Sequence, residues 1–252
     1  MTATQALGID IGGTGIKSAI VDTTTGQLVT PRMRVPTPHP STPDAVAKVV
    51  AEIAHQAGWT GGIGATFPAV IQHGVARSAA NVDPSWIGTD VDACFTEAAP
   101  EASEVFVLND ADAAGIAEAR FGAARDVPGV VILLTFGTGI GSALLMDGRL
   151  VPNTELGHLE LDGHDAEKRA AASVRDENKM SYKDWAKRVE RYMQHVESLF
   201  TPDLFVVGGG VSKDADKWVP RLNLNTPVKA AELLNDAGIV GAAIAAAERR
   251  GE

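Results

Sequence analysis

The residues best suited to catalysis are an amide and a carboxylate, Asn109-Asp110, which follow the apolar run Val105-Phe-Val-Leu108. Polar groups at the carboxyl end of a buried strand in an α/β sheet lie where ligands usually bind. Asn109 offers both a donor and an acceptor, while an ionised Asp110 can remove a proton from a hydroxyl. The alternative is that these side chains cap the Ala-rich helix that follows, for which Asp112 is the better candidate.

Two glycine-rich segments are suited to binding phosphate. Gly13-Thr-Gly-Ile-Lys-Ser-Ala-Ile20 and Gly137-Thr-Gly-Ile-Gly-Ser-Ala-Leu144 are identical at six of eight positions and lie about half the chain apart. Glycines remove side chains, so backbone N–H groups can converge on an anion, and the first segment adds a hydroxyl and a positive charge. The alternative is a glycine hairpin without a ligand. The predicted phosphate-binding residues are Gly12, Gly13, Thr14, Lys17, Gly137, Thr138 and Gly139.

Both segments are expected to be turns between two strands. Apolar residues alternate over 7–11 before the first segment, and 130–134 is an apolar run before the second. A P-loop is excluded because Ile16, rather than Gly, precedes Lys17. A dinucleotide-binding fingerprint is excluded because Gly15 opens a strand and not a helix.

The repeated hairpin predicts an α/β protein of two similar lobes, each opening with strand, glycine turn and strand. We expect the lobes at 1–110 and 111–252, with a ligand cleft between them across which the two turns face each other. The last helix, at 239–249, is free to pack back on the first lobe. Periodic apolar residues predict a long helix at 181–200.

The polar string Asn153-Thr-Glu-Leu-Gly-His-Leu-Glu160 predicts contacts with sugar hydroxyls. The carboxylates of Glu155 and Glu160 and the imidazole of His158 are groups that make charge-assisted hydrogen bonds. The alternative is that His158 is a structural residue. Later, Gly208-Gly-Gly210 follows a buried run and allows close backbone approach to a ligand.

A basic stripe is expected along the helix at 181–200. Its members recur at four-residue spacing, and Arg188 is adjacent to them: Lys179, Lys183, Lys187 and Arg191. Such a stripe is either a solvated helix face or, in an acidic protein, a guide for a long polyanion.

The composition excludes several classes of protein. The net charge of −10 over 252 residues argues against nucleic acid and anionic membrane as partners. The single Cys94 excludes an internal disulfide and a multi-cysteine metal site, which favours a reducing compartment. The first residues lack the basic region and apolar core of a leader, and no apolar run approaches membrane-spanning length, so we expect a cytoplasmic protein.

Taken together, these motifs resemble the ROK family of sugar kinases, whose members have the actin-like ATPase (ribonuclease H-like) fold. The resemblance spans nearly the whole chain and is closest to the family's polyphosphate-using members. Its motifs, in order, are Ile9-Asp-Ile-Gly-Gly-Thr-Gly-Ile-Lys17, Thr66-Phe-Pro-Ala69, Asn81-Val-Asp-Pro-Ser-Trp86, Asn109-Asp110, Thr135-Phe-Gly-Thr-Gly-Ile-Gly141, Glu155-Leu-Gly-His158, Leu161-Asp-Gly-His-Asp-Ala-Glu-Lys-Arg169 and Val206-Val-Gly-Gly-Gly210.

The resemblance implies a mechanism and its residues. Asp110 would act as general base on the 6-hydroxyl of glucose, and Asp10 would hold Mg²⁺ through water. Glu167 would be the second sugar glutamate, with Glu160 as the rival, and Gly209 would belong to the phosphate-binding set. The sugar-binding residues implied in all are Asn81, Asn109, Glu155, His158 and Glu167. The expected donor is inorganic polyphosphate, with weaker use of ATP, and the expected assembly is a homodimer.

One departure from the family is informative. Many ROK members carry a cysteine cluster after the sugar motif that binds structural zinc, and this chain has no cysteine there. We therefore expect no structural zinc. Two alternatives to a polyphosphate glucokinase remain: an ATP-dependent glucokinase or glucomannokinase, and a non-catalytic sugar-binding module. Repressors of the family add a DNA-binding segment before the first hairpin, where this sequence has six residues before Leu7.

Overall fold

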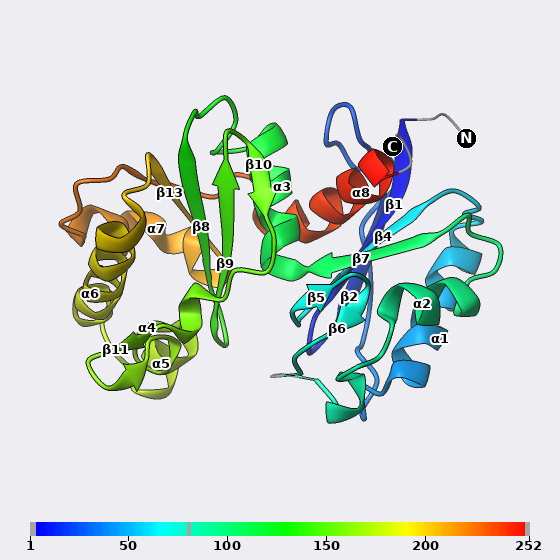
Figure 1. Cartoon of the computed structure of the whole chain (residues 1–252), viewed down its shortest axis with the longest axis horizontal. Coiled ribbons are helices and arrows are strands. Elements are labelled where there is room, and N and C mark those ends of the chain that lie inside the picture. Colours follow the sequence, from blue (N-terminus) through cyan, green and yellow to red (C-terminus); the bar gives the residue numbers. More distant parts are fainter. Residues whose placement is uncertain (1–3, 80–81, 250–252) are drawn as a thin grey trace. The chain divides into compact units, whose positions relative to one another are not determined.

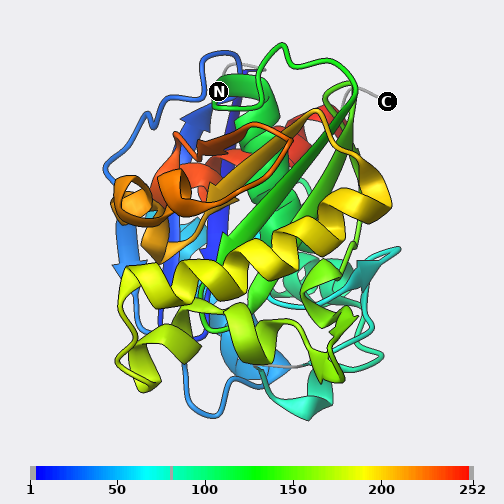
Figure 2. The ribbon, with the colours of Figure 1, turned by 90° about the vertical axis from the view of Figure 1, so that its left-hand side faces the viewer.

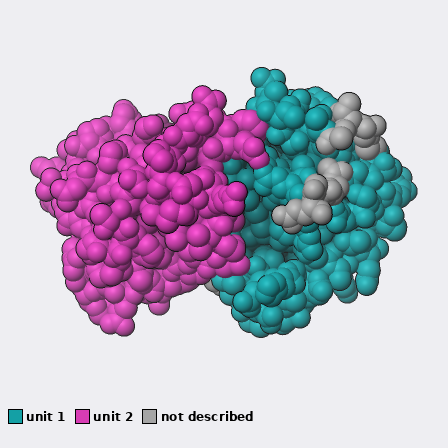
Figure 3. Space-filling model, turned by 45° about the horizontal axis from the view of Figure 1, so that its top comes forward, with its two compact units in different colours: residues 1–117, 236–252 teal, residues 118–235 magenta. Residues whose placement is uncertain are grey.

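The computed structural model describes residues 4–79 and 82–249 and forms two compact units. Unit 1 comprises Met1–Ala117 and Asp236–Glu252, and unit 2 comprises Glu118–Asn235 (Figure 3, teal and magenta). The division therefore falls after residue 117, within a helix, and not between 110 and 111 as the sequence predicts. The C-terminal segment belongs to unit 1, as the sequence analysis allowed for the last helix.

Unit 1 is built on a five-stranded sheet of order β3-β2-β1-β4-β7 (Figure 1). The first three strands form an antiparallel meander, and β4 and β7 continue the sheet in parallel. The strands are β1 (Gln5–Ile11), β2 (Ile16–Asp22), β3 (Met33–Val35), β4 (Ile63–Phe67) and β7 (Val105–Asn109), and a small hairpin is formed by β5 (Ile71–Gln72) and β6 (Val75–Ala76).

Helices cover both faces of this sheet. On one face, α1 (Pro43–Gln56) and α2 (Val91–Ala98) close a core that includes Leu7, Ile9 and Phe95. On the other face lie α3 (Asp110–Phe121) and α8 (Ala237–Arg249), which share a second cluster with the end of β7. Figure 1 shows α8 and the pair α1 and α2 on opposite sides of the strands.

Glycines explain how the C-terminal helix completes unit 1. A Cβ atom on Gly8 of β1 would collide with the carbonyl of Ile239, and one on Gly64 of β4 would collide with the carbonyl of Ala242. The absence of these two side chains lets the backbone of α8 lie directly on the strands. Helix α8 is therefore a fixed layer of unit 1, although it is the last element of the chain.

Unit 2 repeats the same strand order in a second five-stranded sheet, β10-β9-β8-β13-β14. Again the first three strands are antiparallel and the last two parallel. The strands are β8 (Val130–Phe136), β9 (Ile140–Met146), β10 (Arg149–Val151), β13 (Leu204–Gly208) and β14 (Val228–Ala230). The shared topology confirms that each half opens with strand, glycine turn and strand.

A long helix covers one face of the second sheet. Helix α6 (Tyr182–Phe200), capped by Ser181, confirms the helix predicted at 181–200 and crosses the strands in Figure 2 (yellow). It buries Trp185, whose ring lies 5.7 Å from that of Phe136 and 5.0 Å from that of Trp218. The remaining elements of the unit are β11 (Glu160–Leu161), β12 (His164–Asp165), α4 (Glu167–Ala170), α5 (Ala172–Glu177) and α7 (Ala215–Trp218). No helix among the described residues is long and apolar enough to cross a membrane.

Candidate active site

The first glycine turn joins β1 to β2. The pair Ile11 and Ile16 ends the ladder, and the N–H of Gly12 donates to the carbonyl of Gly15 at 3.1 Å. The hydroxyl of Thr37 donates to the carbonyl of Gly12 at 2.5 Å and ties the turn to the segment after β3. Gly13 and Thr14 are exposed, and the structure gives their N–H groups no acceptor among the described residues. These donors are available to an anion.

An ion pair lies directly behind this turn. The ladder pairs Asp10 with Lys17, and the Nζ of Lys17 is 2.8 Å from Asp10 Oδ2. The other oxygen, Oδ1, accepts a hydrogen bond of 3.0 Å from the hydroxyl of Thr66, a fully buried residue that also accepts from the N–H of Ile11. Thr66 therefore orients Asp10. The sequence motif containing Thr66 was recognised, but this contact was not predicted.

A second cation near the first turn was missed in the sequence. The register between β2 and β3 places Arg34 beside Lys17, and the Arg34 guanidinium donates to the carbonyl of Thr14 at 3.2 Å. A Cβ on Gly15 would meet that guanidinium, so Gly15 lets Arg34 lie across the turn. The first turn thus has two cations beside its exposed amides.

The Asn109-Asp110 pair is placed at the junction of β7 and α3. The side-chain oxygen of Asn109 accepts hydrogen bonds from the N–H groups of Ala111 and Asp112 at 2.8 and 3.2 Å, so Asn109 caps α3. The expectation that Asp112 is the cap is wrong, because Asp112 lies inside the first turn of the helix and is 2% exposed. Asn109 also donates to the carbonyl of Ala69 at 3.1 Å.

Asp110 is the exposed first residue of α3. Its Oδ1 accepts a hydrogen bond of 2.9 Å from the N–H of Ala111. The N-terminus of a helix favours negative charge, so this position suits a carboxylate that must remain ionised. Asn81, the other sugar-binding residue predicted in this half of the chain, lies outside the described residues.

The second glycine turn joins β8 to β9 and is closed by a hydrogen bond of 3.0 Å from the N–H of Gly137 to the carbonyl of Gly139. Ser173 holds it from outside, donating from its N–H to Gly137 and from its hydroxyl to the carbonyl of Thr138 at 2.7 Å. The N–H of Ile140 donates to the carboxylate of Glu167 at 3.0 Å. An acid therefore lies against the second turn, in the place where the first turn has cations.

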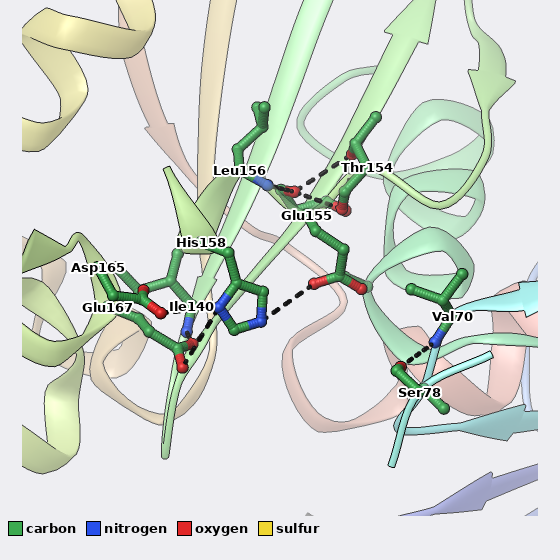
Figure 4. Close-up of polar contacts among 12 residues, drawn as sticks. Val70, Ser78, Ile140, Thr154, Glu155, Leu156, His158, Asp165 and Glu167 are labelled. Atoms are coloured by element: carbon green, nitrogen blue, oxygen red, sulfur yellow. Dashed lines mark hydrogen bonds and ion pairs between the residues drawn. The ribbon is translucent and has the colours of Figure 1, made fainter. Parts of the chain in front are cut away.

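Glu155 and His158 are fixed to the second hairpin by their neighbours. The buried hydroxyl of Ser142 on β9 donates to the carbonyl of Thr154 at 2.7 Å and accepts from the N–H of Leu156 at 2.9 Å (Figure 4). A Cβ on Gly157 would collide with the carbonyl of Ile140, so only glycine permits this approach. The sugar motif is thus attached to the same strand that leaves the second glycine turn.

The imidazole of His158 lies among three carboxylates, with Glu155 on one side and Asp165 and Glu167 on the other (Figure 4). Nε2 is 3.8 Å from Glu155, and Nδ1 is 3.2 Å from Asp165 and 3.8 Å from Glu167. Asp165 lies in one of the family-like motifs, but its contact with His158 is not predictable from the sequence. Glu160, the rival of Glu167, is exposed on β11.

These charges shift the pKa values of the cluster. Burial alone lowers the pKa of His158, but the hydrogen bond to Asp165 and the charges of Glu167, Asp165 and Glu155 outweigh it, so the net shift is upward. Burial raises the pKa of Glu155; the charge of His158 offsets part of this rise, and the charge of Glu167 adds a smaller upward contribution. His158 is therefore biased toward its charged form, in which both ring nitrogens donate hydrogen bonds.

The same cluster has the donor atoms of a metal site. His158, Asp165 and Glu167 each offer one ligand atom, and these atoms lie within 4.8 Å of one another. Zinc sites of the structural type are commonly built on thiolates. The absence of structural zinc stays a prediction.

Gly209 has a structural reason to be glycine. It follows β13 with a positive φ of 83°, and a Cβ there would collide with the carbonyl of Phe136, the last residue of β8. The backbone after β13 therefore lies against the start of the second glycine turn. Its predicted role in phosphate binding stays a prediction.

The chain belongs to the ROK family, whose model matches residues 6–173. Mycobacterium tuberculosis (strain CDC 1551 / Oshkosh) has a protein named polyphosphate glucokinase that is 55% identical over 245 residues, covering 97% of this chain and 92% of that protein. A protein of the same name from Mycobacterium leprae is 54% identical over 241 residues, covering 96% of this chain and 74% of its own length.

Solved structures agree with this assignment. The inorganic polyphosphate/ATP-glucomannokinase from Arthrobacter sp. strain KM is 54% identical, with a TM-score of 0.91 over 98% of this chain and 99% of that chain. A ROK family glucokinase from Streptomyces griseus, solved with glucose and AMPPNP, has a TM-score of 0.82 at 22% identity over 97% of this chain and 99% of its own. The fold is the actin-like ATPase fold, as the sequence predicts, with its two lobes seen as the two units.

Proposed function

We propose that this protein transfers a phosphoryl group from inorganic polyphosphate to the 6-hydroxyl of glucose. The observation that carries the proposal is the hydrogen bond between Glu167 and the N–H of Ile140. It joins a glycine turn suited to phosphate with a carboxylate and imidazole cluster suited to sugar hydroxyls. The relatives named polyphosphate glucokinase, at 55% and 54% identity, support polyphosphate as the donor.

The chemical step needs one base. Asp110 accepts the proton of the 6-hydroxyl while that oxygen attacks the terminal phosphorus, and the shortened phosphate chain leaves. The exposed carboxylate at the start of α3 is able to meet a substrate, and Asn109 beside it holds the strand–helix junction. Asn81, Asn109, Glu155, His158 and Glu167 hold the sugar. Proximity and orientation supply much of the rate.

The donor phosphates are bound by the two glycine turns. The exposed amides of Gly13 and Thr14 donate to phosphate oxygens, and Lys17 offsets the charge that develops on them. Lys17 exchanges part of its contact with Asp10 for the phosphate. The second turn contributes Gly137 to Gly139, and Gly209 lies behind it. The full proposed phosphate-binding set is Gly12, Gly13, Thr14, Lys17, Gly137, Thr138, Gly139 and Gly209.

Asp10 suits the magnesium that the family resemblance implies. Mg²⁺ takes oxygen ligands and keeps several waters, and the carboxylate of Asp10 is an oxygen donor with 17% of its side chain exposed. Thr66 and Lys17 hold it in one orientation, so its remaining lone pairs can accept from metal-bound water. When bound, the metal supplies charge to the phosphates. From the same resemblance we propose a homodimer acting in the cytoplasm.

ATP is the second donor we propose, used less well than polyphosphate. The polyphosphate/ATP-glucomannokinase from Arthrobacter, at 54% identity, favours this second activity. Because that relative is a glucomannokinase, mannose is a second acceptor to be tested.

The experiment uses the purified protein with Mg²⁺, glucose and long-chain polyphosphate as the only donor. The expected product is glucose 6-phosphate, identified by ³¹P NMR and by its oxidation with glucose-6-phosphate dehydrogenase. If product forms from ATP but not from polyphosphate, the protein is still a sugar kinase, but polyphosphate is not its donor. Absence of product from both donors would favour a non-catalytic sugar-binding module.

A further inference from the structure

A cavity of about 200 Å³ lies in unit 2 between α6, α4 and the β11–β12 hairpin. No residue of either glycine turn lines it, so it is separate from the proposed transfer site. Its volume is below the range of roughly 300–1,000 Å³ for pockets that take drug-sized ligands, so it suits a small group. The lining residues are Leu161, Asp162, His164, Ala166, Arg169, Ala170, Lys187, Arg188, Arg191 and Tyr192.

The lining is cationic in a protein whose net charge is −10. Four of the residues just named are Arg or Lys, against one carboxylate. Asp162 pairs with Arg191 at 2.7 Å. Asp184, which lies on α6 together with Lys187, pairs with Lys187 at 3.1 Å. Within the described part of the chain, no carboxylate pairs with Arg169 or Arg188. Two guanidinium groups are thus left for an external anion.

The two unpaired arginines are held close to each other. Arg188 donates to the backbone carbonyl of Arg169 at 3.4 Å, so its side chain lies across α4. The indole of Trp185 donates to the carbonyls of Ala170 and Ala171 at 3.0 and 3.2 Å and locks α4 against α6. The two helices that form the walls are therefore fixed against each other before any ligand binds, which reduces the entropy lost on binding.

A buried hydroxyl points to a ligand independently. Tyr192 lines the cavity and is 1% exposed, and its hydroxyl has no hydrogen-bond partner among the residues that the structure describes. A buried polar group without a partner destabilises the folded protein. Burial, and then the charge of Glu167, raise the pKa of Tyr192, so the hydroxyl stays a donor. An anion accepting this hydrogen bond would remove the cost.

We propose that this cavity binds a phosphoryl group of an inorganic phosphate chain, away from the phosphate that is transferred. Arginine forks donate paired hydrogen bonds to phosphate oxygens, and Arg169 and Arg188 supply two such forks in the cavity that Tyr192 also lines. The inference rests on the proposed function for the identity of the chain. The cavity takes the place of the basic stripe as the proposed binding site for a polyanion. Lys179 precedes α6 with a φ of 50°, and neither Lys179 nor Lys183 lines the cavity.

Binding is measured by isothermal titration calorimetry on the whole chain without glucose, so that no transfer occurs. The ligands are long-chain polyphosphate, tripolyphosphate and orthophosphate. The variants are the double substitution Arg169→Gln with Arg188→Gln, and Tyr192→Phe. Lys168→Gln is the matched control, since it removes an exposed cation next to Arg169 that is not part of the lining. Urea unfolding curves verify that each variant is folded.

The double variant is expected to weaken long-chain binding at least about tenfold, as loss of charged hydrogen bonds predicts. Tyr192→Phe should weaken it about threefold, while Lys168→Gln should stay within about twofold. In turnover, the double variant should raise KM for long chains and leave kcat and the KM for ATP unchanged. Equal losses in Lys168→Gln would overturn the proposal, because they would indicate a diffuse charge effect.

The phosphate source is distinguished by the other two ligands. If only orthophosphate binding depends on the two arginines, the cavity is a free-phosphate site and the chain-anchoring proposal fails. If the wild type makes no glucose 6-phosphate from polyphosphate, the proposed donor fails, but the binding data still decide the cavity. Loss of chain binding in the double variant would then still support it.

Discussion

The two glycine hairpins have nearly the same sequence and the same place in their sheets, yet their surroundings differ in charge. Lys17 and Arg34 lie beside the first turn, whereas Glu167 accepts a hydrogen bond from the second at Ile140. The first turn is thus suited to stabilising phosphate charge. The second turn is connected, through Glu167, to the cluster proposed to bind sugar. Two turns of nearly the same sequence can therefore differ in function, because different side chains of each unit lie beside them.

The largest expected effect separates the proposed general base in unit 1 from the proposed sugar-binding glutamate Glu155 in unit 2. Asp110→Asn removes the proposed general base and should lower kcat by about 10²- to 10⁴-fold, with little change in KM for glucose. Glu155→Gln in unit 2 should instead raise KM for glucose. Steady-state kinetics on both variants test this division. Near-normal turnover by Asp110→Asn would remove the base from the mechanism.

The next effect concerns the cation of the first turn. Lys17→Gln should lower kcat/KM for polyphosphate by about 10- to 100-fold, because a charge-assisted hydrogen bond to phosphate is worth about 1.5–3 kcal/mol. Arg34→Gln, whose side chain is more exposed, should have a smaller effect. Both are measured at fixed ionic strength. Ser173→Ala removes a hydroxyl that holds the second turn. If it lowers kcat/KM for polyphosphate more than Lys17→Gln or Arg34→Gln does, the difference in charge between the two turns has no function.

A smaller effect tests the link between the second turn and the sugar cluster. A Cβ on Gly139 would collide with the Glu167 carboxylate, whereas one on Gly13 has nothing within 4 Å. Gly139→Ala should therefore raise KM for glucose about tenfold, as expected for one displaced charged hydrogen bond. Gly13→Ala should raise KM for polyphosphate and leave KM for glucose unchanged. The same result from both substitutions would contradict the link.

The smallest effect is a shift in a titration. Asp165→Asn should lower the pKa of His158 toward its ordinary 6.5, because the hydrogen bond and charge of Asp165 raise it in the wild type. Because the pKa of His158 is raised in the folded protein, its charged form stabilises the fold. The contribution of charged His158 is complete below pH 6.5 and is lost as pH rises through the raised value.

Histidine NMR titration and unfolding at several pH values measure both quantities. The difference in unfolding free energy between wild type and Asp165→Asn should be largest just below pH 6.5 and shrink toward alkaline pH. A His158 pKa that is the same in both proteins would contradict the role assigned to Asp165.

Much of the fold could be predicted because it follows from patterns among residues that are close together in the sequence. Alternating apolar residues and glycine turns indicated the hairpins, and the near-identity of two segments indicated the repeat. The boundary at 110–111 was misplaced because packing decides it. Helix α3 continues from unit 1 into unit 2, and α8 returns to unit 1 through contacts at Gly8 and Gly64.

Parts of the candidate site could not be predicted because they depend on contacts between distant residues. Arg34 reaches Thr14 only through the register of β2 and β3, and Asp165 reaches His158 only through the β11–β12 hairpin. Whether Asn109 or Asp112 caps α3 depends on the residue at which β7 ends. Residue types indicated the chemistry, and the tertiary fold chose the partners.

The central claim, that polyphosphate is the preferred donor, is tested most directly by competition in one tube. Glucose and Mg²⁺ are mixed with the protein, unlabelled polyphosphate and ATP labelled in its γ-phosphate, at equal concentrations of chain ends and ATP. The labelled fraction of glucose 6-phosphate gives the ratio of kcat/KM for the two donors. We predict that most of the product is unlabelled. Product carrying the label at nearly the level seen with ATP alone would contradict the account.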